Sequence, residues 1–329
     1  MKRVFLLTIS VIATLFFVSG CTQKKNNRVQ SGNGKITITA TIFPQYDFVR
    51  AVAGGSRQPF ADKVNLSMLL PPASESHSFE PTPKDIITIQ KSDIFIYVGG
   101  ESDEWVNRIL ESMDTRNMTI IALMDTVDVV EEEIVEGMEE EAVAEDSANT
   151  EEEAAYDEHV WTSPQNAVRI VRSIADALCS ADNANADFYR QNADDYIAQL
   201  DELDAEFQAV VNNAKRKTIV FGDRFPFRYF ADRYGLSYFA AFPGCSTETE
   251  PSAGTVAFLI DKIKAEKIPV VFYIELGNER MAGTIAEETG AEKLLLHACH
   301  NISKKDFENG ATYIDLMRQN VENLRRALQ

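Results

Sequence analysis

Positive charge is scarce in this sequence. Its 329 residues include 32 Lys and Arg against 51 Asp and Glu, which gives a formal net charge of -19. A nucleic-acid-binding protein needs a basic stripe to neutralise phosphates, and none occurs here, so nucleic acid is not expected as a partner. Much of the acidic excess lies in residues 131–158, which contain fourteen Asp or Glu and no Lys or Arg.

Cysteine is also scarce, with four residues in the whole chain. Cys21 belongs to the N-terminal segment, which leaves Cys179, Cys245 and Cys299. Because three is an odd number, at least one of them stays unpaired, and their connectivity cannot be deduced from sequence. Cys179 falls in a helical pattern and is predicted to be a small buried residue. Cys245 and Cys299 follow strand-like runs in the same half. The sequence therefore allows two alternatives for them, a disulfide bond or two free thiols.

The N-terminal segment reads as a targeting sequence. Two basic residues precede an apolar stretch, residues 4–18, which is too short to span a bilayer comfortably. Small residues just before Cys21 resemble a bacterial lipobox, in which that cysteine is lipidated and becomes the first mature residue. An ordinary secretory signal and an uncleaved anchor helix are the alternatives. We therefore expect a signal peptide over residues 1–20, a flexible tether over residues 21–34, and a lipid-anchored, extracytoplasmic protein.

The rest of the chain alternates strand-like and helical patterns, which predicts an α/β fold with parallel sheets flanked by helices. A long helical pattern without Gly or Pro, residues 184–214, predicts one rigid helix of roughly 45 Å joining two lobes. The lobes are expected over residues 35–183 and 215–329, in a monomer. Four strands are predicted for each mainly parallel sheet: residues 35–43, 65–70, 93–98 and 118–124 in the first, and 218–221, 236–242, 270–274 and 293–296 in the second.

The acidic stretch, residues 131–158, has no apolar period and no opposite charge to relieve its repulsion. These properties predict a disordered loop within the N-terminal lobe. Two roles stay open for it. It leads directly into Asp157, Glu158 and His159, where a mobile loop would raise the local concentration of cations, and it could equally be a solubilising insertion.

Histidine is as rare as cysteine, and each copy lies just beyond a strand-like run or at a helix start: His77, His159, His297 and His300. Ligands of open α/β sheets bind outside the carboxyl ends of the strands, so two sheets facing each other across a cleft would bring such residues together. His77, His159 and His300 are the candidate metal ligands, whereas His297 is expected to be structural. Asp223 follows the fifth predicted strand and Glu275 ends the seventh, although each could instead cap a helix.

This combination of side chains predicts the kind of site. Imidazoles with a carboxylate suit zinc and tolerate manganese or iron when oxygen ligands increase. Three histidines and one carboxylate leave no open coordination position, which favours holding a metal over chemistry. A metallohydrolase would need a general base such as Glu75 or Glu158, and no motif of a substrate pocket accompanies them, so an enzyme is not predicted.

Several contiguous motifs stand out along the chain: ATIFP (residues 40–44), ESHSFEPTP (75–83), EHVW (158–161), YFA (229–231), YGL (234–236), EPS (250–252) and AEETG (286–290). Through these motifs, over residues 36–328, the chain resembles the zinc- and manganese-binding proteins of ABC importers, the ZnuA and TroA type. The resemblance implies two α/β lobes joined by a long helix, with zinc or, alternatively, manganese bound between them and delivered to an ABC permease. A metal-stabilised surface adhesin is the other alternative.

The resemblance also implies ligand positions. The family's first two histidine ligands fall on His77 and His159, and its last ligand falls on His300. Its third ligand falls on Arg224, which cannot ligate because it stays protonated, or on Asp223 after a shift of one residue. The predicted set is therefore His77, His159, His300 and Asp223. Glu75, Glu275 or water are the alternatives to Asp223, and Arg224 is expected to pair with a nearby carboxylate.

Overall fold

A computed structural model describes residues 34–55, 63–75, 79–138, 155–246, 250–277 and 279–329. The predicted signal peptide with Cys21, nearly all of the tether, and His77 lie outside the described residues. Within the described part of the chain, no helix is both long enough and apolar enough to cross a bilayer.

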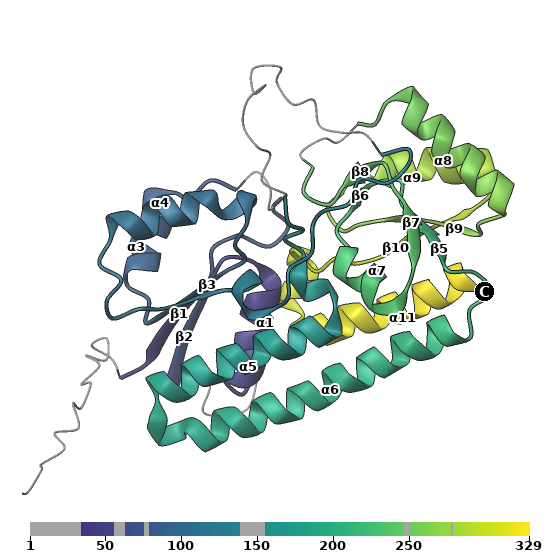
Figure 1. Cartoon of the computed structure of the whole chain (residues 1–329). Helices are drawn as coiled ribbons and strands as arrows, with labels where there is room; N and C mark the ends of the chain where they lie inside the picture. Colours follow the sequence, from purple (N-terminus) through teal and green to yellow (C-terminus); the bar gives the residue numbers. More distant parts are fainter. Residues whose placement is uncertain (1–33, 56–62, 76–78, 139–154, 247–249, 278) are drawn as a thin grey trace, which may run out of the picture.

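The first sheet has four parallel strands in the order β2-β1-β3-β4. β1 reads ITITA, and burial of most of its residues explains why β-branched side chains dominate it. Helices cover both faces of this sheet, with α3 and α4 on one side and α1 and α5 on the other (Figure 1). The elements are β1 (Ile36–Ala40), α1 (Phe43–Val52), β2 (Val64–Met68), α3 (Pro83–Gln90), β3 (Ile94–Tyr97), α4 (Glu104–Ser112), β4 (Thr119–Ala122) and α5 (Pro164–Ala181).

The second half contains two parallel pairs, β5 with β7 and β9 with β10. A parallel bridge between Phe221 and Phe272 joins the pairs, so the four predicted strands lie in the order β7-β5-β9-β10. A further short pair, β6 with β8, was not predicted. The elements are β5 (Thr218–Val220), β6 (Arg224–Phe225), α7 (Arg228–Tyr234), β7 (Ser237–Phe239), β8 (Phe242–Pro243), α8 (Ala253–Glu266), β9 (Val270–Tyr273), α9 (Glu279–Thr289), β10 (Glu292–Leu295) and α10 (Lys304–Glu308).

The predicted long helix is present as α6 (Ala186–Asn212), which has 27 residues and is therefore roughly 40 Å long. It runs beneath both halves of the molecule, next to α11 (Tyr313–Leu328) (Figure 1). Asp204 in the second half of α6 accepts hydrogen bonds from Arg233 and Tyr234 of α7. The packed helices α6 and α11 thus contact both halves. Such a rigid connection opposes a wide hinge motion of one half relative to the other.

The acidic stretch is not disordered at its two ends. Glu131 forms an antiparallel bridge with Tyr156, and the backbone N–H of Glu132 donates to the carbonyl of Ala155 at 2.9 Å. Beyond this bridge the chain contacts the second half, where Tyr238 donates to Glu133 at 3.0 Å. The prediction of disorder is therefore wrong for residues 131–138 and 155–158. The backbone pairing of the two ends and their contacts with the second half offset the repulsion between the acidic side chains. Residues 139–154 lie outside the described residues.

All three remaining cysteines are free thiols. Cys179 is buried in α5 as predicted, and Cys299 is fully buried. A disulfide between Cys245 and Cys299 is therefore excluded, and the alternative of two free thiols holds.

Candidate metal centre

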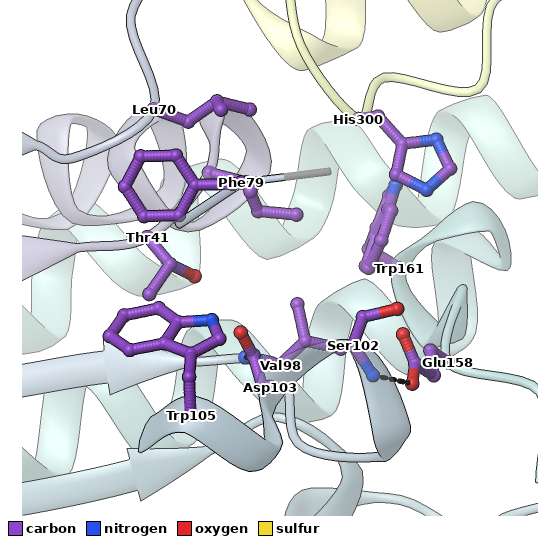
Figure 2. Close-up of a pocket in the computed structure, with 11 residues that line it drawn as sticks. Thr41, Leu70, Phe79, Val98, Ser102, Asp103, Trp105, Glu158, Trp161 and His300 are labelled. Atoms are coloured by element: carbon purple, nitrogen blue, oxygen red, sulfur yellow. Dashed lines mark hydrogen bonds between the residues drawn. The ribbon is translucent and has the colours of Figure 1, made fainter. Parts of the chain in front are cut away.

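Three aromatic rings meet where the two halves adjoin. His159 and Trp161 lie in the turn that precedes α5, and His300 lies in the loop after β10. The centroids of the two imidazoles are 4.4 Å apart, and the indole of Trp161 lies 5.6 Å from His159 and 5.0 Å from His300. Figure 2 shows Trp161 directly beside His300. Two of the predicted ligands are thus brought together from positions 141 residues apart.

The loop that carries His300 is held from two sides. Glu275 accepts backbone N–H groups of Ala298 at 2.6 Å and His300 at 2.9 Å, one on each carboxylate oxygen. The indole N–H of Trp161 donates to the carbonyl of Ala298 at 2.8 Å. Glu275 is buried, and burial raises its pKa to about 8. The Glu275 side chain organises the His300 loop by accepting these two backbone N–H groups.

His297 is buried next to Glu275, and its Nδ1 lies 3.4 Å from Oε2 of that residue. Its Nδ1 accepts the backbone N–H of Cys299 at 3.0 Å, and Asn320 of α11 bonds both its N–H and its carbonyl. Burial lowers the pKa of His297 to about 4, so the ring is neutral at physiological pH. These backbone contacts agree with the structural role that the sequence predicted for His297.

His159 has a carboxylate behind it. Oδ1 of Asp157 lies 3.0 Å from Nδ1 of His159 and also accepts the backbone N–H of His159 at 2.8 Å. A hydrogen bond from Nδ1–H to this carboxylate selects the tautomer in which Nε2 carries the lone pair that a metal requires. The sequence analysis did not assign this role to Asp157, although its position two residues before a candidate ligand was a usable signal.

Arg224 of the second half lines a small pocket together with Glu75 and His300. Its guanidinium pairs with Glu75 of the first half at 3.0 Å and donates to the carbonyl of Ser246 at 3.2 Å. The side chain of Arg224 is 8% exposed. This confirms the prediction that Arg224 pairs with a carboxylate, and it gives Glu75 a cationic partner across the two halves.

Asp223, the predicted carboxylate ligand, is held by backbone groups of its own half. Oδ1 accepts the N–H of Arg224 at 2.9 Å, and Oδ2 accepts the N–H of Ile274 at 3.4 Å. A Cβ at position 277 would lie 2.2 Å from Oδ2, so only the glycine present there leaves room for this carboxylate. Within the ranges that the structure describes, no three His, Cys, Asp or Glu side chains are grouped to hold a metal. The ligand role of Asp223 stays a prediction.

A small cavity of about 30 Å³ opens beside His300, with room for one or two waters. Glu158 lines it and accepts the backbone N–H of Ser102 at 2.8 Å, as the dashed line in Figure 2 marks. Asp103 lines it too, and burial raises the pKa of Asp103 to about 6 and that of Glu158 above its usual value. Carboxylates beside two imidazoles make this part of the cleft favourable for a cation.

Comparisons with known proteins agree with this architecture. A family model described as zinc-uptake complex component A, periplasmic, matches residues 38–327. The high-affinity zinc uptake system protein ZnuA of Bacillus subtilis is 31% identical over 97% of this chain and 96% of its own length. The zinc-binding protein AdcA of Streptococcus pyogenes is 31% identical over 99% of this chain, which spans 61% of that relative's length.

A solved structure shows the same fold. The zinc-bound ZnuA-like domain of Streptococcus pneumoniae AdcA superposes with a TM-score of 0.71 at 28% identity, covering 90% of this chain and 99% of that domain. The metal-dependent lipoprotein YcdH of Bacillus subtilis gives a TM-score of 0.72 at 29% identity, covering 89% of this chain and 99% of that one. With the match over residues 38–327, these similarities establish that the chain belongs to the ZnuA family of zinc-uptake components.

Proposed function

We propose that this protein captures a divalent transition metal ion outside the cell and passes it to the permease of an ABC importer, with zinc as the preferred cargo and manganese as the alternative. The observation that carries the proposal is the contact between the imidazoles of His159 and His300, which come from opposite halves and meet at 4.4 Å. The zinc-bound relative of the same fold supports the choice of ion.

The proposed ligands are His77, His159, His300 and Asp223. His159 and His300 are already adjacent, and His77 follows in sequence Glu75, which lines the same small pocket as His300. Three imidazoles favour zinc over manganese, because manganese sites carry more oxygen ligands. Water, Glu75 or Glu275 are the alternatives to Asp223.

The remaining proposals concern the setting of the protein. The Cys21 motif supports a lipid anchor on the extracytoplasmic face, after removal of residues 1–20 and with residues 21–34 as a tether. Two lobes, residues 35–183 and 215–329, would act as a monomer around the linking helix of residues 184–214. A ligand set without an open position supports transport without catalysis.

Zinc analysis of the purified protein tests the proposal. The chain from Cys21 onward should carry about one zinc ion, and zinc at 1,000 times its Kd should stabilise the fold by about 4 kcal/mol. His159→Ala and His300→Ala should abolish the zinc-induced rise in Tm. His297→Asn is the matched control, because an amide oxygen can still accept the N–H of Cys299, and it should retain zinc. Greater stabilisation by manganese at equal free concentration would overturn the choice of ion.

A further inference from the structure

A buried tyrosine of α7 lies between the two ends of the acidic stretch. The hydroxyl of Tyr229 donates to the carbonyl of Asp157 at 2.7 Å and accepts the backbone N–H of Val130 at 3.3 Å. Tyr229 is 5% exposed. One phenol of the second half therefore holds both chain segments that enter and leave the acidic stretch.

This contact leads directly to a proposed metal ligand. The N–H of Asp157 donates to the carbonyl of Val130 at 3.0 Å, so the Asp157 backbone is fixed through both its N–H and its carbonyl. The carboxylate of the same residue holds the backbone and Nδ1 of His159. Only one residue thus stands between the Tyr229 hydroxyl and the imidazole.

The second half also limits the ring of His159 from another direction. A Cβ at position 244 would lie 3.0 Å from Cε1 of His159 and 2.9 Å from the carbonyl oxygen of Phe225. The glycine present there lets the backbone approach the imidazole closely. Next to it, the N–H of Cys245 donates to Glu132 at 3.0 Å, which ties this backbone to the acidic stretch. His159 is consequently enclosed, with 0% exposure.

We propose that Asp157 and Tyr229 are positioning residues for His159: the Asp157 carboxylate selects the tautomer and orientation of the imidazole, and the Tyr229 hydroxyl holds the main chain of Asp157, which carries that carboxylate. The inference rests on the proposed metal-binding function. Groups that orient a ligating histidine typically change metal affinity by about 10-fold to 100-fold. Because Tyr229 belongs to α7 and His159 precedes α5, relative movement of the halves that breaks the phenol contact also loosens the ligand.

Tyr229→Phe tests this inference with little change in packing, because it removes only the hydroxyl. We expect the Kd for zinc, measured by competition with a chromophoric chelator, to rise about tenfold. Tyr234→Phe is the matched control: it lies on the same helix, is 3% exposed, and donates its hydroxyl to Asp204 at 2.8 Å, away from His159. Its Kd should stay at the wild-type value, although this variant also loses a buried hydrogen bond; Tyr229→Phe loses the two that its hydroxyl makes.

Asp157 is tested with two substitutions. Asp157→Ala removes the acceptor for Nδ1–H, and the Kd for zinc should rise about 10-fold to 100-fold. Asp157→Asn keeps an oxygen acceptor, so it should recover most of this loss. The visible d–d absorption of the cobalt(II)-loaded protein should shift in Asp157→Ala, because that spectrum reports ligand geometry, and should stay close to wild type in Asp157→Asn.

The outcomes separate this inference from the proposed function. Wild-type protein that binds no zinc refutes the proposed function itself. Wild-type binding, with Tyr229→Phe weakening zinc no more than Tyr234→Phe, overturns the positioning role of Tyr229. Equal losses in Asp157→Ala and Asp157→Asn overturn the positioning role of Asp157, because they leave the carboxylate's charge as the cause. If Asp157→Ala does not fold, the comparison of Asp157→Asn with wild type by cobalt spectrum decides.

Discussion

Replacing Trp161 by Phe should weaken both the fold and the metal centre. The indole is 1% exposed, contacts the rings of His159 and His300, and donates its N–H to the carbonyl of Ala298. Phe keeps an aromatic ring but cannot donate. The Ala298 carbonyl is left without this donor in a buried place, at a cost of about 1 to 3 kcal/mol. The smaller ring leaves a cavity worth about 1 kcal/mol more.

Urea unfolding of the metal-free protein, followed by circular dichroism, measures this loss. We expect the free energy of unfolding to fall by about 2 to 4 kcal/mol with an unchanged m-value. Trp105→Phe is the matched control, because Trp105 is the other tryptophan of the chain and its indole packs against Phe79 at 5.8 Å. This control should cost clearly less.

The same two variants report on the metal centre. Trp161 is the sole tryptophan in the Trp105→Phe variant, so zinc should change the fluorescence of that variant strongly. In Trp161→Phe the remaining Trp105 lines the cavity beside His300 without that ring contact, so zinc should change the emission less. The Kd for zinc should rise in Trp161→Phe, because the His300 loop loses one of its two supports. A loss of stability under 1 kcal/mol, or unchanged zinc affinity, would refute this account of the indole.

Two further predictions concern charged groups. The resemblance to the family implies its third ligand at position 224. Arg224→His replaces a fixed positive charge there by a neutral ligand, so we expect the affinity for zinc to rise at least about tenfold, or about 1.4 kcal/mol, in chelator competition. Weaker binding in this variant would mean that the pair with Glu75 orders the site. Burial raises the pKa of Asp103 from 3.8 to about 6, so the folded state binds this proton more tightly and loses stability as pH rises from about 4 to 6. Both backbone N–H groups that Asp103 accepts go to Oδ2, which an amide oxygen can replace. Asp103→Asn should therefore be more stable than wild type at pH 7, by up to about 2 to 3 kcal/mol in urea unfolding, with a difference that vanishes near pH 4.

The acidic stretch shows where prediction from sequence fails. Composition alone indicated disorder, because fourteen like charges without a partner repel each other. The partners of its first residues lie far along the chain: Glu133 accepts from Tyr238, and Glu132 accepts from Cys245. No local sequence pattern predicts these contacts, because they form only when the second half has folded beside the first.

The sequence by itself determined the fold class, the long helix and the family, because strand and helix periodicities are local properties and the motifs around His77 and His159 are contiguous. It also identified His159 and His300 as candidates, since strand ends of parallel sheets converge. Only the tertiary structure decided what surrounds them. The Arg224 to Glu75 pair joins residues 149 apart, and the Tyr229 contact to Asp157 spans 72 residues. Those contacts depend on how α6 and α11 place the two halves relative to each other. This placement results from side-chain packing between distant segments, which local sequence patterns do not encode.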